Sequence, residues 1–320
     1  TAILLMALMA VMAVGLIACG TDKSDNESTK EEKTSVTITS LDSSKNEIEL
    51  EVPYNPKRIA ILDLASLDII DELGVGDRVV GMASTSIDYL EKYSNDSSIK
   101  NLGTIKEADL EAVMECEPDI IFIGGRLSNS YDALSEIAPV VYLATDTNEG
   151  LVNSVSKNAK TIASIFGMED KVNSLMSDFG ARIDAIKKIS SGKTALVGMT
   201  TSGSFNLLGN DGRCSLIGVE AGFNNLTAAG STSTHGNESS FETVVQQNPD
   251  YIFVMDRDSA ISTAGAKTAK EIVENELVKT TDAYKNNHII YLEHSNVWYT
   301  AEGGIQALDI MLTDLEKGLK

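Results

Sequence analysis

Positive charge is scarce in this sequence, which has 26 Lys and Arg residues against 47 Asp and Glu residues and a formal net charge of -21. So acidic a surface repels nucleic-acid phosphates and gains nothing from anionic lipid headgroups. Aromatic residues make up only 5% of the chain, which lacks the repeats of collagen-like, coiled-coil and prion-like proteins. The composition therefore excludes a nucleic-acid-binding protein and a polybasic membrane-binding protein.

Several motifs of enzymes are also absent. The sequence contains no Gly-x-x-x-x-Gly-Lys-Ser/Thr phosphate loop and no Gly-x-Ser-x-Gly nucleophile elbow. Gly74, Gly76 and Gly81 lack the spacing and the preceding strand of a dinucleotide-binding motif. His288 and His294 bracket a predicted strand and do not have the spacing of a metal site. We therefore expect a protein that is not an enzyme and has no permanently bound cofactor.

The first 18 residues are uncharged and apolar. We interpret them as an export signal that lacks its beginning, with a retained transmembrane helix as the alternative. The segment ends in Leu16, Ile17, Ala18 and Cys19, which resembles a bacterial lipobox. Cys19 is therefore the predicted lipidation site, and two or more acyl chains would anchor the protein stably to a membrane.

A polar segment follows the predicted signal. Residues 19–35 have too few apolar side chains to form a core, so we expect the lipidated Cys and a flexible tether there. Beyond Cys19 only Cys116 and Cys214 remain. An exported protein could oxidise them, but they lie in different halves of the chain, and we expect two separate buried thiols.

The two halves of the chain resemble each other. A helical stretch from Leu110 ends in Glu117-Pro118-Asp119 before the apolar run 120–123, and one from Phe241 ends in Asn248-Pro249-Asp250 before the run 251–254. Both sets are 131 positions apart. Short apolar runs between helical segments are typical of parallel strands buried on both faces. We therefore predict an α/β fold of two lobes, each with a mostly parallel sheet flanked by helices.

An arginine follows the repeated strand in each half, at Arg126 and Arg257. Ligands of open parallel sheets bind beyond the carboxyl ends of the strands. A single such arginine could be an ordinary surface charge, but its recurrence at the same spacing favours a shared binding cleft.

Between the halves, apolar residues follow a helical period from Glu169 to Ile189. We predict one long, stiff helix that links the lobes. The expected organisation is an N-terminal lobe over residues 36–167, a linking helix over 168–190 and a C-terminal lobe over 191–320.

These features together resemble the iron-siderophore-binding lipoproteins of ABC importers, which have the class III periplasmic-binding-protein fold. The resemblance covers residues 36 to 320 and rests on the lipobox, the duplicated lobes, the linking helix and five short segments. These segments are Pro56 to Asp63, Gly124-Gly125-Arg126, Thr234-His235-Gly236, Asn248 to Arg257 and Asn296 to Tyr299. It is strongest for the branch that takes catecholate siderophores.

The resemblance implies three ligand-binding arginines, Arg126, Arg213 and Arg257, with Trp298 beside them. A ferric catecholate is anionic, and guanidinium groups suit its clustered oxygens. The resemblance also implies His235 and Tyr299 as iron ligands when the siderophore supplies only four donors. A solvated loop histidine and an aromatic wall are the respective alternatives.

The resemblance further implies that one exposed carboxylate on each lobe docks onto an ABC permease dimer. Glu107 and Glu238 are the candidates, being 131 positions apart, and an ordinary acidic residue at a helix N-terminus is the alternative. We thus expect a monomeric, lipid-anchored, extracytoplasmic protein that delivers a ferric siderophore. A cobalamin- or haem-binding lipoprotein on the same fold is the main alternative, followed by a zinc or manganese binder and an adhesive surface protein.

Overall fold

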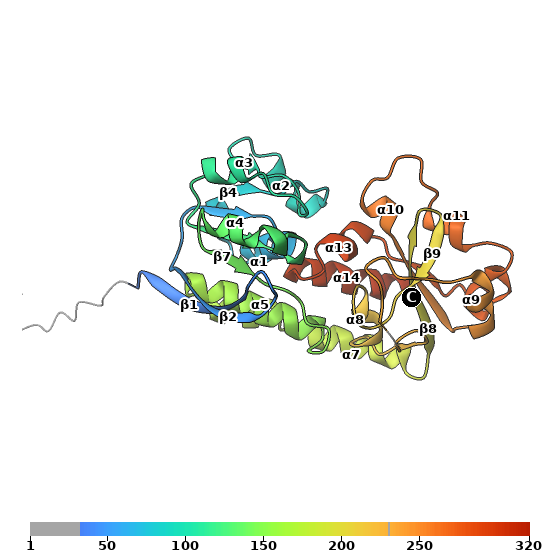
Figure 1. Cartoon of the computed structure of the whole chain (residues 1–320). Helices are drawn as coiled ribbons and strands as arrows, with labels where there is room; N and C mark the ends of the chain where they lie inside the picture. Colours follow the sequence, from blue (N-terminus) through green and yellow to red (C-terminus); the bar gives the residue numbers. More distant parts are fainter. Residues whose placement is uncertain (1–32, 230) are drawn as a thin grey trace, which may run out of the picture. The chain divides into compact units, whose positions relative to one another are not determined.

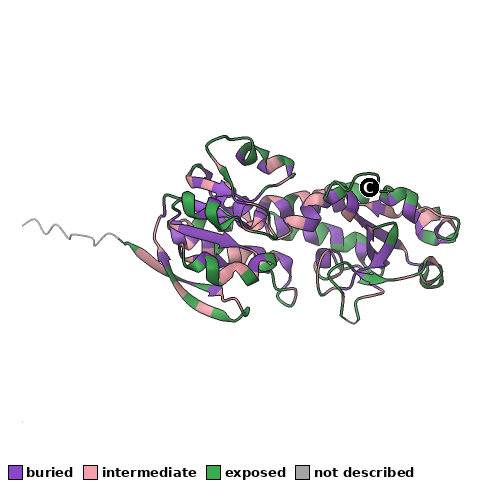
Figure 2. Ribbon diagram, turned by 45° about the horizontal axis from the view of Figure 1, so that its top comes forward, coloured by how far each residue is buried: buried purple, intermediate pink, exposed green. Residues whose placement is uncertain are grey.

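The duplicated apolar runs form the central strands of two sheets. The computed structural model describes residues 33–229 and 231–320, and residues 34–320 form one compact unit (Figure 1). Every side chain of the first repeated strand, β6 (Ile120–Ile123), is buried, and its counterpart β12 (Tyr251–Asp256) is buried up to its last residue. Figure 2 shows the strands as buried segments inside a more exposed layer of helices and loops. The prediction of an α/β fold with parallel sheets is confirmed.

The sheet of the N-terminal lobe is fully parallel, with the strand order β5-β4-β3-β6-β7. Its remaining strands are β3 (Ile59–Ile61), β4 (Val79–Met82), β5 (Lys100–Asn101) and β7 (Val140–Tyr142). Its helices are α1 (Leu64–Glu72), α2 (Glu91–Ser94), α3 (Leu110–Glu115), α4 (Tyr131–Ser135) and α5 (Leu151–Phe166). Short 3-10 turns are at Gly76–Arg78, Asp88–Leu90 and Gly125–Ser130.

The sheet of the C-terminal lobe has the order β11-β9-β8-β12-β13, and β10 also pairs with β8. Strand β9 pairs antiparallel with both β8 and β11, and the other pairs are parallel. The other strands are β8 (Thr194–Thr201), β9 (Ser204–Leu207), β10 (Asn224–Asn225), β11 (Asn237–Glu238) and β13 (Ile289–Tyr291). The helices are α8 (Ser215–Gly218), α9 (Phe241–Gln247), α10 (Arg257–Ala260), α11 (Ala269–Val273), α12 (Asp282–Lys285), α13 (Ser295–Thr300) and α14 (Ile305–Gly318), with a 3-10 turn at Val278–Thr280.

The sequence repeat has the same structural role in both lobes. Asp119 accepts hydrogen bonds from the backbone of Lys57 and Arg58, at the start of β3. Asp250 accepts from the backbone and hydroxyl of Thr194, at the start of β8. Each aspartate thereby fixes the start of its repeated strand, β6 or β12, against the start of the neighbouring strand, β3 or β8. The carboxyl ends of β6 and β12 therefore have equivalent positions in the two sheets.

The prediction of one unbroken linking helix is wrong. Residues 169–190 form two helices, α6 (Glu169–Leu175) and α7 (Phe179–Ser190), separated by a three-residue turn. In this turn the Ser177 hydroxyl and backbone N–H both donate to the Ser174 carbonyl, at 2.8 and 3.3 Å. Serine side chains compete in this way with the regular backbone ladder and interrupt a helix. The break therefore lies at residues 176–178.

The last helix of the chain provides a further connection between the lobes. Helix α14 packs against α1 and α5 of the N-terminal lobe and also against α7. The carboxylate of Asp68 on α1 accepts hydrogen bonds from the first-turn backbone N–H groups of Gln306 and Ala307, both at 2.9 Å. These groups have no partner within their own helix, so Asp68 caps α14 across the lobes.

An antiparallel hairpin precedes the first lobe. It consists of β1 (Ser35–Leu41) and β2 (Glu47–Pro53), and the Ser40 hydroxyl accepts a hydrogen bond from the backbone N–H of Tyr142 at 3.0 Å. Ser35, placed in the tether by the sequence, belongs to this hairpin. The predicted signal segment, Cys19 and nearly all of the tether lie outside the described residues. Within the residues that are described, no helix is long and apolar enough to span a bilayer.

Cys116 and Cys214 are both free and buried. Burial raises the pKa of each thiol above its ordinary value. The expectation of two separate, buried thiols is confirmed.

Candidate functional site

Both repeated arginines lie at the carboxyl ends of parallel strands. Two glycines separate Arg126 from the end of β6, and Arg257 directly follows β12 as the first residue of α10. A Cβ atom at Gly124 would lie 2.5 Å from a carboxylate oxygen of Asp63, so a side chain at this position would have to displace the Asp63 carboxylate. The chain therefore passes close to the end of β3 before it presents Arg126.

The three predicted arginines converge on Tyr299. The guanidinium carbons of Arg126, Arg213 and Arg257 lie 5.8, 4.5 and 5.5 Å from the centre of the Tyr299 ring. Arg126 and Arg213 also donate to its backbone carbonyl, at 3.1 and 3.5 Å. Arg257 donates from Nε to its hydroxyl oxygen at 3.1 Å. One tyrosine thus holds three positive charges together by cation–π contacts and hydrogen bonds.

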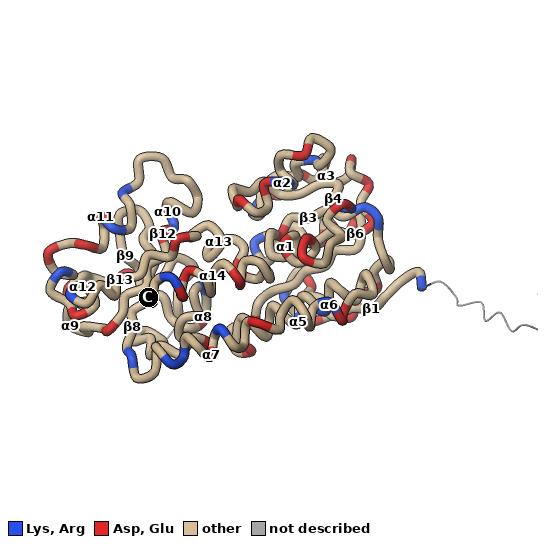
Figure 3. The backbone as a smooth tube through the Cα atoms, turned by 180° about the vertical axis from the view of Figure 1, so that it is seen from behind, with Lys and Arg blue, Asp and Glu red and all other residues tan. Residues whose placement is uncertain are grey.

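The arginines change the titration of the groups between them. Removal from water alone would raise the pKa of Tyr299, but the hydrogen bond from Arg257 and the charges of Arg257, Arg213 and Lys106 lower it below the ordinary value. Burial and the neighbouring Arg213 lower the pKa of Arg126. Arg126 stays charged at physiological pH. The site is a concentrated positive charge in a chain whose acidic residues are distributed over both lobes (Figure 3).

His235 lies in an exposed loop near the same arginines. Arg213 fixes this loop by donating to the carbonyl of Thr234 at 2.8 Å, and Asn206 donates to the carbonyl of His235 at 2.8 Å. Partial removal from water and the charges of Arg257 and Arg213 lower the pKa of His235. The imidazole is therefore neutral at pH 7, which is the form that ligates a metal.

Lys106 is a further cation that the sequence did not predict. It lies in the exposed turn 104–107 of the N-terminal lobe, yet its charge acts on both Tyr299 and His235. The position 131 residues later is Asn237, so Lys106 has no counterpart in the sequence repeat. Nothing in the local sequence distinguishes it from an ordinary surface lysine.

A pocket of about 780 Å³ opens beside the arginine cluster. Asp63 and Arg126 line it from the N-terminal lobe, and Arg213, Tyr299 and Glu302 line it from the other side. Its volume is within the range of small-molecule sites. Arg257 and His235 are not part of this wall, although Arg257 contacts the Tyr299 hydroxyl. The arrangement can bind an anion that presents several oxygens to more than one guanidinium group.

The prediction that Trp298 contacts the ligand is wrong, because its side chain is buried in the core. Its side chain is 0% exposed and packs in the core, and its indole N–H donates to Asp314 at 3.0 Å. The indole is therefore turned away from the pocket, although its neighbour Tyr299 lines it.

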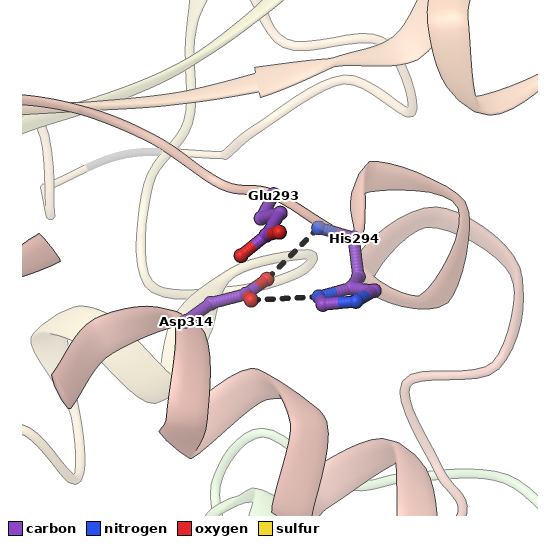
Figure 4. Close-up of side chains that lie close together, drawn as sticks. All are labelled: Glu293, His294 and Asp314. Atoms are coloured by element: carbon purple, nitrogen blue, oxygen red, sulfur yellow. Dashed lines mark hydrogen bonds and ion pairs between the residues drawn. The ribbon is translucent and has the colours of Figure 1, made fainter. Parts of the chain in front are cut away.

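Asp314 holds the helix that carries Tyr299. It accepts from Trp298, and from the backbone N–H and ring Nδ1 of His294 at 3.0 and 2.8 Å (Figure 4). Glu293 lies close enough to complete a set of three metal-ligating side chains. However, both oxygens of Asp314 already accept hydrogen bonds, and Glu293 pairs with Lys317 at 2.9 Å. These hydrogen bonds and this ion pair explain the cluster of Glu293, His294 and Asp314 as a structural contact that holds α13 against α14.

The two predicted docking glutamates are both exposed. Glu107 lies in the turn before α3, and Glu238 lies in β11, just before α9. Asp109 and Ser240 cap the two helices, and the acidic residues of their first turns are Glu111 and Glu242. Glu107 and Glu238 therefore precede the first helical turn, and the helix dipole does not account for them.

Two duplicated α/β lobes with a polar, charged pocket beside the carboxyl ends of their strands define a solute-binding protein. The family described as periplasmic binding protein matches residues 59–295, and the chain belongs to this family. The prediction that the chain is not an enzyme agrees with this membership.

The relatives with the same fold include siderophore-binding proteins. The chain is 36% identical to the petrobactin-binding protein YclQ of Bacillus subtilis, over 97% of this chain and 96% of that protein. The crystal structure of YclQ matches with a TM-score of 0.82, over 90% of this chain and 99% of that one. The catecholate-siderophore-binding protein VctP of Vibrio cholerae matches with a TM-score of 0.79 and 30% identity, over 88% of this chain and 100% of that one.

Proposed function

We propose that this protein captures a ferric siderophore of the catecholate type and delivers it to an ABC importer. The observation that carries this proposal is the convergence of Arg126, Arg213 and Arg257 on Tyr299. Three fixed positive charges favour an anionic chelate and repel a bare metal cation. The 36% identical relative is named a petrobactin-binding protein, which supports the same class of ligand.

In this proposal the iron arrives as cargo inside its chelate. Arg126, Arg213 and Arg257 bind the catecholate oxygens, which carry the negative charge. A phenolate oxygen is a hard ligand that suits ferric iron, and the lowered pKa of Tyr299 favours that form. A neutral His235 and a deprotonated Tyr299 complete the coordination of a chelate that supplies four donors.

A binding panel tests the proposal. The fluorescence of Trp298, the only tryptophan, is titrated with ferric catecholates, ferric hydroxamates, haem and cobalamin. Trp298 is buried next to Tyr299 along the chain, so an absorbing ligand quenches it by energy transfer without contact. We expect saturable quenching by the ferric catecholates. Saturation by haem or cobalamin alone would support the alternative ligand class, and saturation by hydroxamates alone would contradict the catecholate branch.

We also propose that Cys19 carries a lipid anchor on the outer side of the cell membrane. Two relatives are named as siderophore-binding or substrate-binding lipoproteins. Intact mass of the protein from membranes tests this anchor. The expected N-terminus is a diacylated Cys19, and Cys19→Ser is expected to release the protein from the membrane fraction.

Docking to the permease dimer is assigned to Glu107 and Glu238. Exposed Leu110 and Met114 lie one turn apart on α3, beside Glu107, and offer an apolar contact next to its charge. Binding to the host permease in nanodiscs tests this. Glu107→Gln with Glu238→Gln is expected to weaken docking about tenfold or more, as expected for the loss of charge-assisted contacts. Glu136→Gln, which removes an exposed carboxylate directly after α4, is the matched control. Equal docking of all three proteins would contradict the assignment.

A further inference from the structure

Glu302 is an acidic residue in the pocket, and a carboxylate does not by itself favour the binding of an anion. It lies in the turn between α13 and α14 and lines the pocket with Arg126 and Arg213. Its Oε1 accepts a hydrogen bond from the backbone N–H of Cys214 at 3.0 Å. Cys214 follows Arg213 directly and has a left-handed backbone with φ of 61°. The carboxylate therefore holds a strained residue next to one of the ligand-binding arginines.

Charges of both signs face this carboxylate from the surrounding elements. Arg213 and Arg126 favour its ionised form, and Glu220, in the loop after α8, opposes it. The charge of Glu302 also helps to raise the pKa of the buried Cys214 thiol, and α14 begins three residues after Glu302. Burial outweighs the hydrogen bond and both arginines, and it raises the pKa of Glu302 to about 7. Both protonation states are therefore populated at neutral pH.

We propose that Glu302 is a positioning residue that takes up a proton from solvent when an anionic chelate enters the pocket. This proposal rests on the proposed function. Without ligand, the ionised carboxylate partly neutralises Arg126 and Arg213. An anion in the same pocket repels it and favours the neutral acid, which leaves both guanidinium groups to the ligand. The carbonyl oxygen of the neutral acid can still accept from Cys214, so the loop of Arg213 stays in place.

The direction of the pH dependence follows from linkage. A proton taken up on binding makes the affinity rise as the pH falls through the pKa of the free protein. If the ligand raises this pKa by one unit from about 7, binding is about fivefold tighter at pH 6 than at pH 8. At pH 7 the uptake is at most about half a proton per ligand, because about half of the free protein is already protonated.

Calorimetry with the gallium(III) complex of petrobactin as the probe tests the proposal. Titrations at pH 7 in phosphate, imidazole and Tris separate the heat of buffer protonation and give the number of protons taken up. Glu302→Gln keeps the hydrogen-bond acceptor but cannot titrate. Glu136→Gln, which removes an exposed carboxylate directly after α4 and away from the pocket wall, is the matched control. We expect the wild-type chain and Glu136→Gln to take up, per ligand, up to about half a proton more than Glu302→Gln, because any proton that Tyr299 releases is common to all three proteins.

Each result of the calorimetry either supports or overturns the proposed proton uptake by Glu302. Zero proton uptake both by the wild-type chain and by Tyr299→Phe, which has no phenol proton to release, overturns it, whether or not Glu302→Gln folds. Equal uptake by Glu302→Gln also overturns it, while the proposed function stands because the ligand still binds. Absence of saturable heat for the wild-type chain, together with no quenching by any ferric catecholate of the panel, contradicts the proposed function itself. A second comparison measures the affinity at pH 6 and pH 8, where the fivefold difference is expected to disappear in Glu302→Gln.

Discussion

The guanidinium group of Arg257 donates to the hydroxyl oxygen of Tyr299 at 3.1 Å while lying 5.5 Å from the centre of its ring. The contact joins the carboxyl end of the second repeated strand to α13, the helix that Asp314 fixes against α14. Arg126 and Arg213 donate hydrogen bonds to the backbone carbonyl of the same tyrosine. Tyr299 therefore contacts arginines from both halves of the sequence repeat.

Removing one arginine is expected to weaken ligand binding strongly. Arg257→Ala should raise the Kd for a ferric catecholate about 10- to 100-fold, because a charge-assisted hydrogen bond contributes about 1.5–3 kcal/mol. Arg126→Ala should act in the same direction. Lys188→Ala, which removes an exposed charge on α7, serves as the control and should leave the Kd unchanged. Equal Kd values for all four proteins would show that the pocket does not bind the ligand through charge.

The role of the Tyr299 hydroxyl is separable from that of its ring. Tyr299→Phe keeps the ring under the three guanidinium groups and removes the oxygen. We expect this variant to lose affinity for a ferric chelate with four donors and to lose its tyrosinate-to-iron absorption band, while a chelate with six donors binds as before. Both are measured by titration in a spectrophotometer. Unchanged spectra with both chelates would favour the aromatic-wall alternative.

The cap of α14 predicts a specific dependence of stability on pH. Burial raises the pKa of Asp68 from 3.8 to about 6. The folded state therefore binds this proton more tightly than the unfolded state, so the contribution to stability is full below about pH 4 and is lost as the pH rises through about 6. Relative to Asp68→Asn, the wild-type protein should gain about 2 kcal/mol in the free energy of unfolding between pH 7 and pH 4.5. Urea denaturation at both values measures this, and parallel pH profiles would contradict it.

Cys116 and Cys214 should stay reduced and protected. In a chain that begins after Cys19, we expect a thiol reagent to label neither residue in the native state and both after denaturation, because burial raises both thiol pKa values and blocks access. Intact mass before and after labelling counts the thiols. Rapid native labelling, or a mass two hydrogens lower, would contradict the two separate buried thiols.

The repeat made much of the fold predictable from the sequence. Apolar runs with Pro-Asp before them located β6 and β12, and the spacing of 131 placed Arg126 and Arg257 at equivalent strand ends. Such features are local in sequence and appear twice, so each copy supports the other. The break between α6 and α7 was missed because the hydrophobic period continues through it, while a serine hydroxyl interrupts the backbone ladder.

The contacts that complete the site could not be predicted in the same way. Asp68 caps a helix more than 200 residues later in the chain. Asp314 binds the indole N–H of Trp298 in the core, away from the pocket. The charge of Lys106 acts on Tyr299, and Lys106 has no counterpart in the other lobe. Each depends on packing between segments far apart in the sequence. No local pattern encodes such a contact, because the partner is set by the tertiary arrangement.

The position of the iron in the loaded protein tests the central claim most directly. Crystals of the protein with a ferric catecholate, measured at the iron absorption edge, give the metal position from its anomalous signal. We predict an iron atom beside Tyr299, with the catecholate oxygens within hydrogen-bonding distance of Arg126, Arg213 and Arg257. An iron atom bound elsewhere, with the three guanidinium groups directed to solvent or to protein carboxylates, would contradict the account.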